Sequence, residues 1–216
     1  MSNTGKMYKR TKKVVGVGIN DADYITQKRE VQPDGSKKII WICPFYQRWY
    51  GLLKRCYGEK ELIKHPTYKD CSVCEEWLYF SKFRAWMVDQ DWEGKDLDKD
   101  LLFEGNKIYS PETCIFLETQ VNRFAILRGN DRGFYPLGVS KTKYGYASKC
   151  SAGTQQNKSV YFKTIAEAHS YWQRKKLERA KLLQSRQTCE RTKLGLQRVV
   201  DKLTNHIEQG VETKSL

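Results

Sequence analysis

The sequence predicts an α+β fold in which a short strand–turn–strand–helix unit packs on aromatic helices and precedes a three-stranded antiparallel sheet with one helix. Three observations support this prediction. Aromatic residues recur at helical spacing in the first half of the chain, and short alternating stretches bounded by turn residues fill the second half. A helix start signal follows the last of these stretches.

The first ninety or so positions predict strands and then helices. Residues 1–13 read as a basic arm, and residues 14–42 as short strands with a turn at Pro33-Asp34-Gly35-Ser36. Residues 44–57 predict a helix that begins with Pro and ends before Gly58. Residues 74–88 predict a second helix. One side of this helix carries an aromatic stripe that we interpret as core, namely Trp77, Phe80, Phe83 and Trp86.

From residue 97 the chain changes to strands and turns. The expected order is a strand (97–103), a turn (104–107), a strand (108–117), a helix (119–127) and a linker (128–133). Three further strands follow at 137–140, 144–151 and 158–162. Thr164 and Glu167 form a capping box that opens a helix running past Leu183. The last thirty residues are polar and predict at most a loosely held helix.

Charge indicates a polyanionic partner. The formal net charge is +14, from 39 Lys and Arg against 25 Asp and Glu, and nucleic acid is the abundant cytosolic polyanion. No segment approaches the ~18 apolar residues of a membrane-spanning helix, so we expect no membrane partner. Met1 is followed by polar residues, so no secretory signal is expected and the cytosol is the expected location.

The seven cysteines have no regular spacing. Cys71 and Cys74 form a single Cys-x-x-Cys pair, and zinc would need two further ligands. Candidates for these ligands are Cys43, Cys56, Cys114 and His65. Small buried side chains are the better interpretation, and we do not expect zinc.

The last three predicted strands form a basic face. Alternation in the middle strand separates two sets, Tyr146, Ser148 and Cys150 against Ala147, Lys149 and Ser151. If the first set faces the helix, Lys149 lies on the open face with other lysines of this module, namely Lys141, Lys143 and Lys158. Such a face fits the DNA major groove, and Arg174 on the helix adds phosphate contacts. The alternative is a small α+β domain with a solvated lysine face.

Residues 134–183 resemble the ethylene-response-factor type of DNA-binding domain, which is also found attached to phage endonucleases. The resemblance is carried by Gly138-Val139-Ser140, Gly145-Tyr146-Ala147, Tyr161-Phe162-Lys163-Thr164, Glu167-Ala168 and Trp172. Relatives usually present arginines where this chain has lysines. Because lysine makes fewer bidentate contacts with guanine, the resemblance implies less sharp sequence specificity here.

The stretch from Trp49 to Phe124 resembles the HNH (ββα-metal) endonuclease proteins of bacteriophages. Its motifs are Arg55-Cys56-Tyr57, Tyr68-Lys69-Asp70-Cys71, Cys74-Glu75-Glu76-Trp77, Leu97-Asp98-Lys99-Asp100, Asn106-Lys107 and Tyr109-Ser110-Pro111-Glu112-Thr113-Cys114. The whole chain is therefore similar to a phage-encoded, homing-endonuclease-like protein acting in the host cytoplasm. The expected domains are the arm and short strands (1–43), an HNH-like domain (44–127), the sheet-and-helix DNA-binding domain (134–185) and a polar tail (186–216).

The resemblance implies phosphodiester hydrolysis of duplex DNA. Carried over by position, Asp98 and Asn122 bind Mg²⁺ or another divalent cation, and Lys99 occupies the general-base position. The usual base is His, and the Asn that commonly orients it is replaced by Thr113. Asp98, Lys99, Asp100 and Glu112 still form a cluster in which Lys99 steadies phosphate charge.

Two hypotheses follow, and a third is weaker. The first is a divalent-metal-dependent, site-directed DNA endonuclease that nicks or cuts both strands. The second is a catalytically inactive DNA-binding regulator derived from such an enzyme, in which the hairpin survives as scaffold. RNA binding is the weaker third hypothesis, because the aromatic residues mostly follow helical spacing and no RNA-binding motif occurs.

Overall fold

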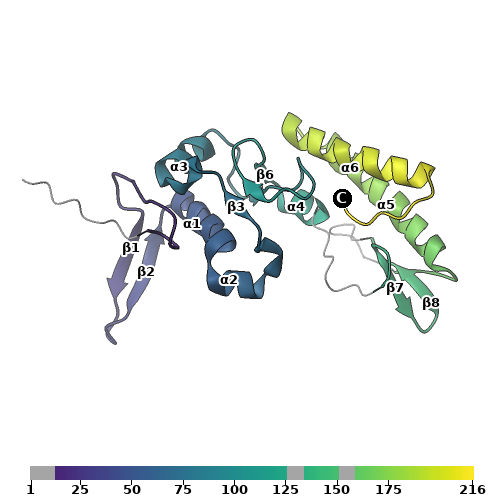
Figure 1. Cartoon of the computed structure of the whole chain (residues 1–216), viewed down its shortest axis with the longest axis horizontal. Coiled ribbons are helices and arrows are strands. Elements are labelled where there is room, and N and C mark those ends of the chain that lie inside the picture. Colours follow the sequence, from purple (N-terminus) through teal and green to yellow (C-terminus); the bar gives the residue numbers. More distant parts are fainter. Residues whose placement is uncertain (1–12, 126–133, 151–158) are drawn as a thin grey trace, which may run out of the picture. The chain divides into compact units, whose positions relative to one another are not determined.

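A computed structural model describes residues 13–125, 134–150 and 159–216 of the chain (Figure 1). The fold is α+β, as predicted. The strands are β1 (Gln27–Val31), β2 (Lys37–Ile42), β3 (Ser72–Val73), β4 (Asp96–Asp98), β5 (Ile108–Tyr109), β6 (Ile115–Leu117), β7 (Val139–Thr142), β8 (Gly145–Ser148) and β9 (Val160–Phe162). The α-helices are α1 (Pro44–Tyr57), α2 (Glu59–Lys64), α3 (Phe80–Val88), α4 (Thr119–Ala125), α5 (Ile165–Ser185) and α6 (Glu190–Glu208), with 3-10 turns at Pro66–Tyr68 and Glu76–Leu78.

The chain divides into two compact units. Unit 1 comprises the residues up to Gln90 together with Lys107–Glu112, and unit 2 comprises Asp91–Asn106 and Thr113–Leu216. The short segment Lys107–Glu112 joins unit 1 because β5 pairs in parallel with β3. The stretch 44–127, which we expected to form one domain, therefore contributes to both units.

The core of unit 1 is aromatic. The predicted helix over residues 44–57 is confirmed as α1, and its Trp49 is fully buried. The Trp49 indole Nε1 donates a hydrogen bond to the carbonyl oxygen of Trp77 (2.7 Å). Phe80 and Phe83 are also fully buried, so this part of the predicted aromatic stripe is core. The predicted helix over 74–88 is split instead into a 3-10 turn and α3, with Tyr79 extended between them.

The strand–turn–strand–helix unit differs from the prediction. β4 pairs antiparallel with β6, from Asp96 opposite Leu117 to Asp98 opposite Ile115, and α4 follows at once. The expected second strand (108–117) is broken, because residues 111–113 form a turn that begins with Pro, which has no N–H for a ladder. Its first part, β5, pairs with β3 rather than with β4.

Unit 2 contains the predicted three-stranded sheet and its helix. The strands form one antiparallel sheet in the order β7-β8-β9. The capping box is confirmed: the Thr164 hydroxyl accepts from the backbone N–H of Glu167 (3.2 Å), and the Glu167 carboxylate accepts from the Thr164 N–H (3.1 Å). The helix runs past Leu183 as predicted. The expected linker (128–133) and residues 151–158 lie outside the described residues.

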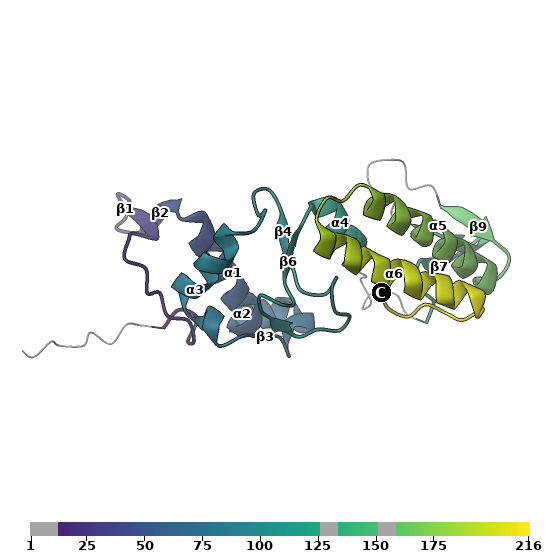
Figure 2. The same cartoon turned by 90° about the horizontal axis from the view of Figure 1, so that it is seen from above.

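The C-terminal region was expected to be polar and loosely held, and the structure corrects this. It forms the 19-residue helix α6, which lies beside α5 (Figure 2). One side of α6 is buried with α4, α5 and β6, through Leu196, Val199, Val200 and Leu203. Unit 2 therefore has its own apolar core, and α6 is part of it.

Candidate functional site

The three-stranded sheet of unit 2 has two chemically different faces. In an antiparallel sheet, directly paired residues lie on the same face. Lys141, Tyr146 and Phe162 pair across the strands and define one face. Phe162 contacts Tyr171 of α5, with ring centroids 5.3 Å apart, so this face turns towards the helix. Ser140, Ala147 and Tyr161 define the other face, which we call the open face.

Helix α5 is held on the sheet by a close contact between the Gly138 backbone and the Trp172 ring. Gly138, just before β7, has φ of 76°, and a Cβ atom there would lie 1.8 Å from Cδ1 of Trp172. Only glycine permits both this backbone conformation and this contact. The buried Trp172 ring therefore rests directly on the start of the sheet.

The predicted DNA-binding residues have different positions. Lys149 is exposed and continues the alternation of Ala147 onto the open face, as predicted. Lys141 was expected beside it, but its register with Tyr146 puts it on the helix-facing side. Lys143 lies in the β7–β8 turn and Arg174 is exposed on α5. Lys158 lies outside the described residues.

Two exposed tyrosines near the open face escaped the sequence reasoning. Tyr161 on β9 is 54% exposed and Tyr144 in the turn is 70% exposed. Their rings meet edge to face, with centroids 6.2 Å apart, and Lys143 Nζ lies 4.8 Å from the Tyr144 ring centre. Exposed Lys163 follows two residues after Tyr161. Strand alternation in β9 was the signal that would have identified Tyr161.

Asp98, the predicted metal ligand, is buried at the end of β4. Its Oδ1 accepts hydrogen bonds from the backbone N–H of Leu101 (2.7 Å) and of Asp100 (3.0 Å). Burial raises the pKa of the Asp98 carboxyl above its usual value, and these hydrogen bonds act in the opposite direction. The side chain therefore shapes the backbone turn that follows β4.

Lys99, at the predicted general-base position, is also buried. Its Nζ lies 2.5 Å from Oδ1 of Asp100 and donates to the carbonyl oxygen of Asn106 (2.6 Å). The Asn106 amide donates in return to the Lys99 carbonyl oxygen (2.9 Å). These bonds close the loop after β4 and hold the Lys99 Nζ atom inside it.

Asn122 contacts a carboxylate other than the predicted one. Its Nδ2 donates to Oδ2 of Asp96 at 3.3 Å. Asp96 pairs with Leu117, two residues before α4 begins, whereas Asp98 pairs farther from the helix. The structure therefore brings Asn122 together with Asp96, a residue that the motif comparison did not identify.

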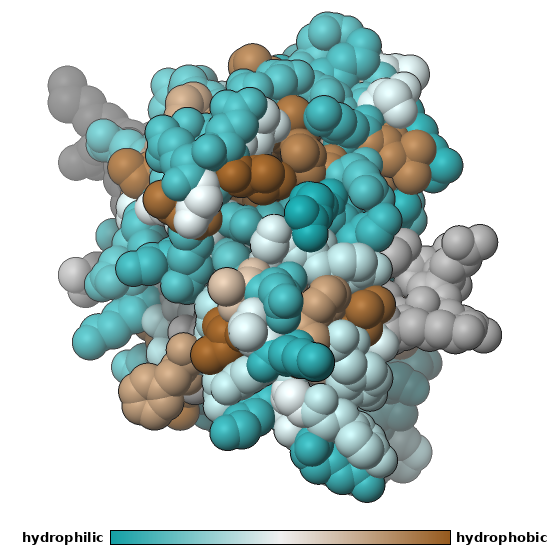
Figure 3. Space-filling view, turned by 90° about the vertical axis from the view of Figure 1, so that its right-hand side faces the viewer, coloured by the Kyte–Doolittle hydropathy of each residue, from teal (hydrophilic) through white to brown (hydrophobic). Residues whose placement is uncertain are grey.

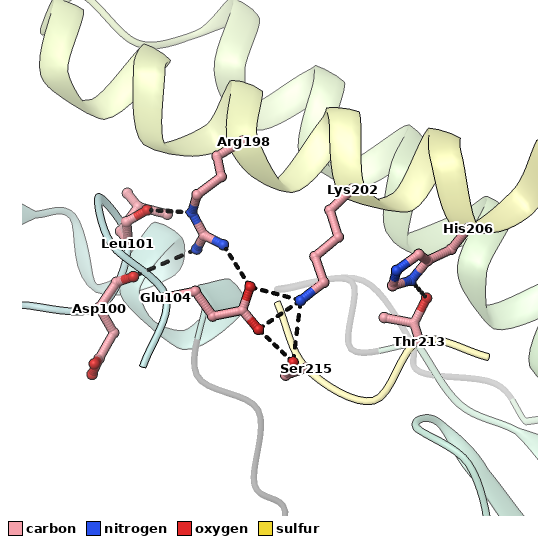
Figure 4. A network of polar contacts seen from close by, with 8 residues as sticks. All are labelled: Asp100, Leu101, Glu104, Arg198, Lys202, His206, Thr213 and Ser215. Atoms are coloured by element: carbon pink, nitrogen blue, oxygen red, sulfur yellow. Dashed lines mark hydrogen bonds and ion pairs between the residues drawn. The ribbon is translucent and has the colours of Figure 1, made fainter. Parts of the chain in front are cut away.

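The loop after β4 is fastened to the last helix. The Glu104 carboxylate binds Arg198 Nη1 (3.2 Å) and Lys202 Nζ (2.6 Å) of α6, and it also accepts from the Ser215 hydroxyl. Arg198 Nε donates to the Leu101 carbonyl oxygen (3.2 Å). Figure 4 shows these side chains converging on Glu104 from the helix and the C-terminal segment. The loop that follows Asp98 is thus a fixed part of unit 2.

These residues do not form the expected Mg²⁺ ligand set. Mg²⁺ binds ionised carboxylates and other hard oxygens. Burial disfavours the charged form of Asp98, and backbone N–H groups occupy its Oδ1. In the described ranges no group of three or more His, Cys, Asp and Glu side chains could hold a metal ion.

The interpretation of the cysteines as small buried side chains holds for four of the seven, whereas Cys74 and Cys150 are partly buried and Cys189 is exposed. Cys43, Cys56, Cys71 and Cys114 are all buried. Burial also raises the pKa of the Cys74 thiol. A raised pKa keeps a thiol protonated at neutral pH, so Cys74 is a weak nucleophile.

Comparison of the chain with protein-family models, with curated proteins and with solved structures found no match in any of the three. Among the described residues, none of the helices combines the length and apolar character needed to cross a membrane. In the face viewed in Figure 3, hydrophilic residues predominate and apolar residues form smaller groups among them.

Proposed function

We propose that this protein binds duplex DNA through the open face of the β7-β8-β9 sheet. The observation that carries the proposal is a sheet with one face on α5 and the other bearing exposed Lys149 and Tyr161, with exposed Lys163 two residues beyond Tyr161. Lysines on a sheet of this size can reach phosphates while the strands enter the major groove. A net charge of +14 favours the same partner.

The tyrosines add a contact that lysines alone do not provide. Tyr144 and Tyr161 present flat, partly apolar rings with a hydroxyl that donates or accepts hydrogen bonds. Such side chains suit base edges and sugars, while lysines at the rim hold the backbone. Because Lys141 belongs to the helix-facing side, the proposed interface is centred on β8 and β9 rather than on all three strands.

For the hairpin we propose a scaffolding role, so that the protein is a non-cleaving DNA-binding regulator of the HNH-derived type. Asp98, Lys99 and Asn122 each bond to other parts of unit 2. A residue that acts on a scissile phosphate needs an accessible polar group in the matching protonation state. Because these three side chains are already hydrogen-bonded within unit 2, a structural role suits them better than a catalytic one.

A divalent-metal-dependent endonuclease is the second candidate. The observation in its favour is the pairing of Asp96 with Asn122 (3.3 Å), which puts a carboxylate and an amide side by side between a strand and the following helix. Neither residue is fully buried. In this case Asp96, rather than Asp98, is the carboxylate that matters.

The binding test is a fluorescence-anisotropy titration of a labelled mixed-sequence DNA duplex. The open-face variant Lys149→Gln/Lys163→Gln should lose about tenfold or more in affinity at moderate salt, because two phosphate contacts are removed. The control variant Lys181→Gln/Lys193→Gln removes the same charge from α5 and α6 and should change affinity by less than about twofold. Equal binding by wild type and the open-face variant would overturn the proposal, as would a preference for structured RNA in competition.

The two candidates are separated by incubating plasmid DNA with the protein in Mg²⁺, in Mn²⁺ and in EDTA. Intact DNA that stays bound in EDTA supports the regulator. Discrete, metal-dependent ends would support the endonuclease, and their loss in Asp96→Asn but not in Asp98→Asn would assign the role to Asp96.

A further inference from the structure

The β1–β2 ribbon of unit 1 is a hairpin with little protein around it. Its strands pair antiparallel, and the Gln32 N–H closes the turn by donating to the Ser36 carbonyl oxygen (2.8 Å). The sheet has these two strands alone within the described ranges. Both views show the turn end of the ribbon extending away from α1, α2 and α3 (Figures 1 and 2).

The ribbon exposes apolar side chains of a kind that folded domains usually bury. Val31 is 65% exposed and Ile40 is 56% exposed, and Ile39 and Trp41 are exposed as well. Two-stranded hairpins without a third strand or a covering helix are marginally stable in water. A ribbon of this kind therefore gains order when a partner covers it.

The register places cations on both faces of the ribbon. Lys28 pairs with Trp41 and Glu30 with Lys38 on one face, whereas Arg29 and Lys37 lie on the other. Lys28 Nζ lies 5.9 Å from the Trp41 ring centre, which agrees with this pairing. The two strands thus carry four cationic side chains and a single carboxylate.

We propose that the β1–β2 ribbon is a second DNA-binding element that lies in a groove of duplex DNA. This inference rests on the proposed function. A two-stranded ribbon fits the major groove, whose walls are phosphates on both sides, and long basic side chains on both faces can reach them. The exposed Trp41, Ile39 and Ile40 then contact sugars and base edges. A second copy of the chain is a poor partner, because the same cations would repel each other.

The test is the salt dependence of DNA binding by the full chain, measured by anisotropy with a labelled mixed-sequence duplex. The ribbon variant changes Lys28, Arg29, Lys37 and Lys38 to Gln. Each lost phosphate contact lowers the slope of log K against log salt by about 0.9, so the slope should fall by about 2 to 4. The matched control removes four exposed lysines of unit 1 outside the ribbon, at Lys60, Lys64, Lys69 and Lys82, and should keep the wild-type slope.

A second measurement needs no substitution in the ribbon. Hydrogen exchange of wild-type peptides from β1 and β2 should slow when DNA is added. This inference is overturned if wild type binds DNA while the ribbon variant keeps the control slope, or while the ribbon peptides exchange at an unchanged rate. A wild type that binds no duplex would instead overturn the proposed function. A ribbon variant that alters only the oligomeric state would identify a protein partner and overturn the DNA role.

Discussion

At the scale of single residues, His169 connects three separated parts of unit 2. Its Nδ1 lies 3.0 Å from the Leu137 carbonyl oxygen, and its Nε2 accepts from the backbone N–H of Thr213 (3.1 Å). Nε2 can accept only in the neutral ring, so the Nδ1 atom carries the proton and donates to Leu137. The ring also stacks on Trp172, with an interplanar angle of 16°. The side chain thus holds the C-terminal segment on the sheet module.

This arrangement predicts an acid-sensitive unfolding free energy. Burial lowers the pKa of His169 in the folded protein below its value of about 6.5 in the unfolded chain. The contribution of the neutral His169 ring to the unfolding free energy is therefore fully present when the pH is above that unfolded-state pKa. As pH falls below that value, the unfolded chain takes up a proton that the folded chain resists, and the unfolding free energy falls. Urea unfolding between mildly acidic and neutral pH measures this, and His169→Gln should show a shallower pH dependence. Parallel curves for the two proteins would contradict the assignment.

Gly138 gives a second prediction at this scale. Gly138→Ala combines a left-handed backbone with a methyl group inside the Trp172 ring, and we expect a loss of about 3 kcal/mol or more in unfolding free energy. The control is Gly35→Ala in the β1–β2 turn. It has a similar φ of 79° but open space around the Cβ position, and should cost only about 1 kcal/mol. Equal losses in the two variants would show that the Trp172 contact is unimportant.

At the scale of elements, α6 is an amphipathic helix whose apolar positions are difficult to recognise in a mostly polar sequence. Its buried residues Leu196, Val199, Val200 and Leu203 follow the i, i+3, i+4, i+7 spacing of one helix face. Charged residues surround them and obscure the pattern by composition. The helix packs closely: a Cβ at Gly195 would lie 2.7 Å from Cγ of Leu101, in the loop that the resemblance had associated with chemistry.

Paired substitutions in α6 test this packing. Leu196 is 0% exposed and Leu194, in the same helix, is 69% exposed. Leu196→Ala should lower the unfolding free energy by about 2 to 5 kcal/mol, because it opens a cavity among α4, α5 and β6. Leu194→Ala should stay within about 0.5 kcal/mol of wild type. Denaturant titration followed by circular dichroism measures both, and similar values would mean that α6 is held loosely after all.

At the scale of the whole molecule, the sequence predicted what depends on local signals. The Pro44 start of α1, the Thr164 capping box and the order of the last three strands all rest on neighbouring residues, and all are confirmed. The pairing of β5 with β3 and of Asn122 with Asp96 depends on residues far apart in the chain. One sequence carries little information about such contacts. The predicted sheet face of Lys141 was wrong for a related reason. Which face a strand residue lies on depends on the pairing register between strands, and the sequence does not give that register.

The path of the chain between the two units affects how the protein is made. The chain leaves unit 1 after Gln90, returns for Lys107–Glu112, and leaves again. On the ribosome, the first ninety residues emerge without the strand that pairs with β3, so unit 1 completes its sheet only after part of unit 2 has been synthesised. A single cut therefore cannot separate the two units, and unit 1 is complete only after the first segment of unit 2 has been synthesised.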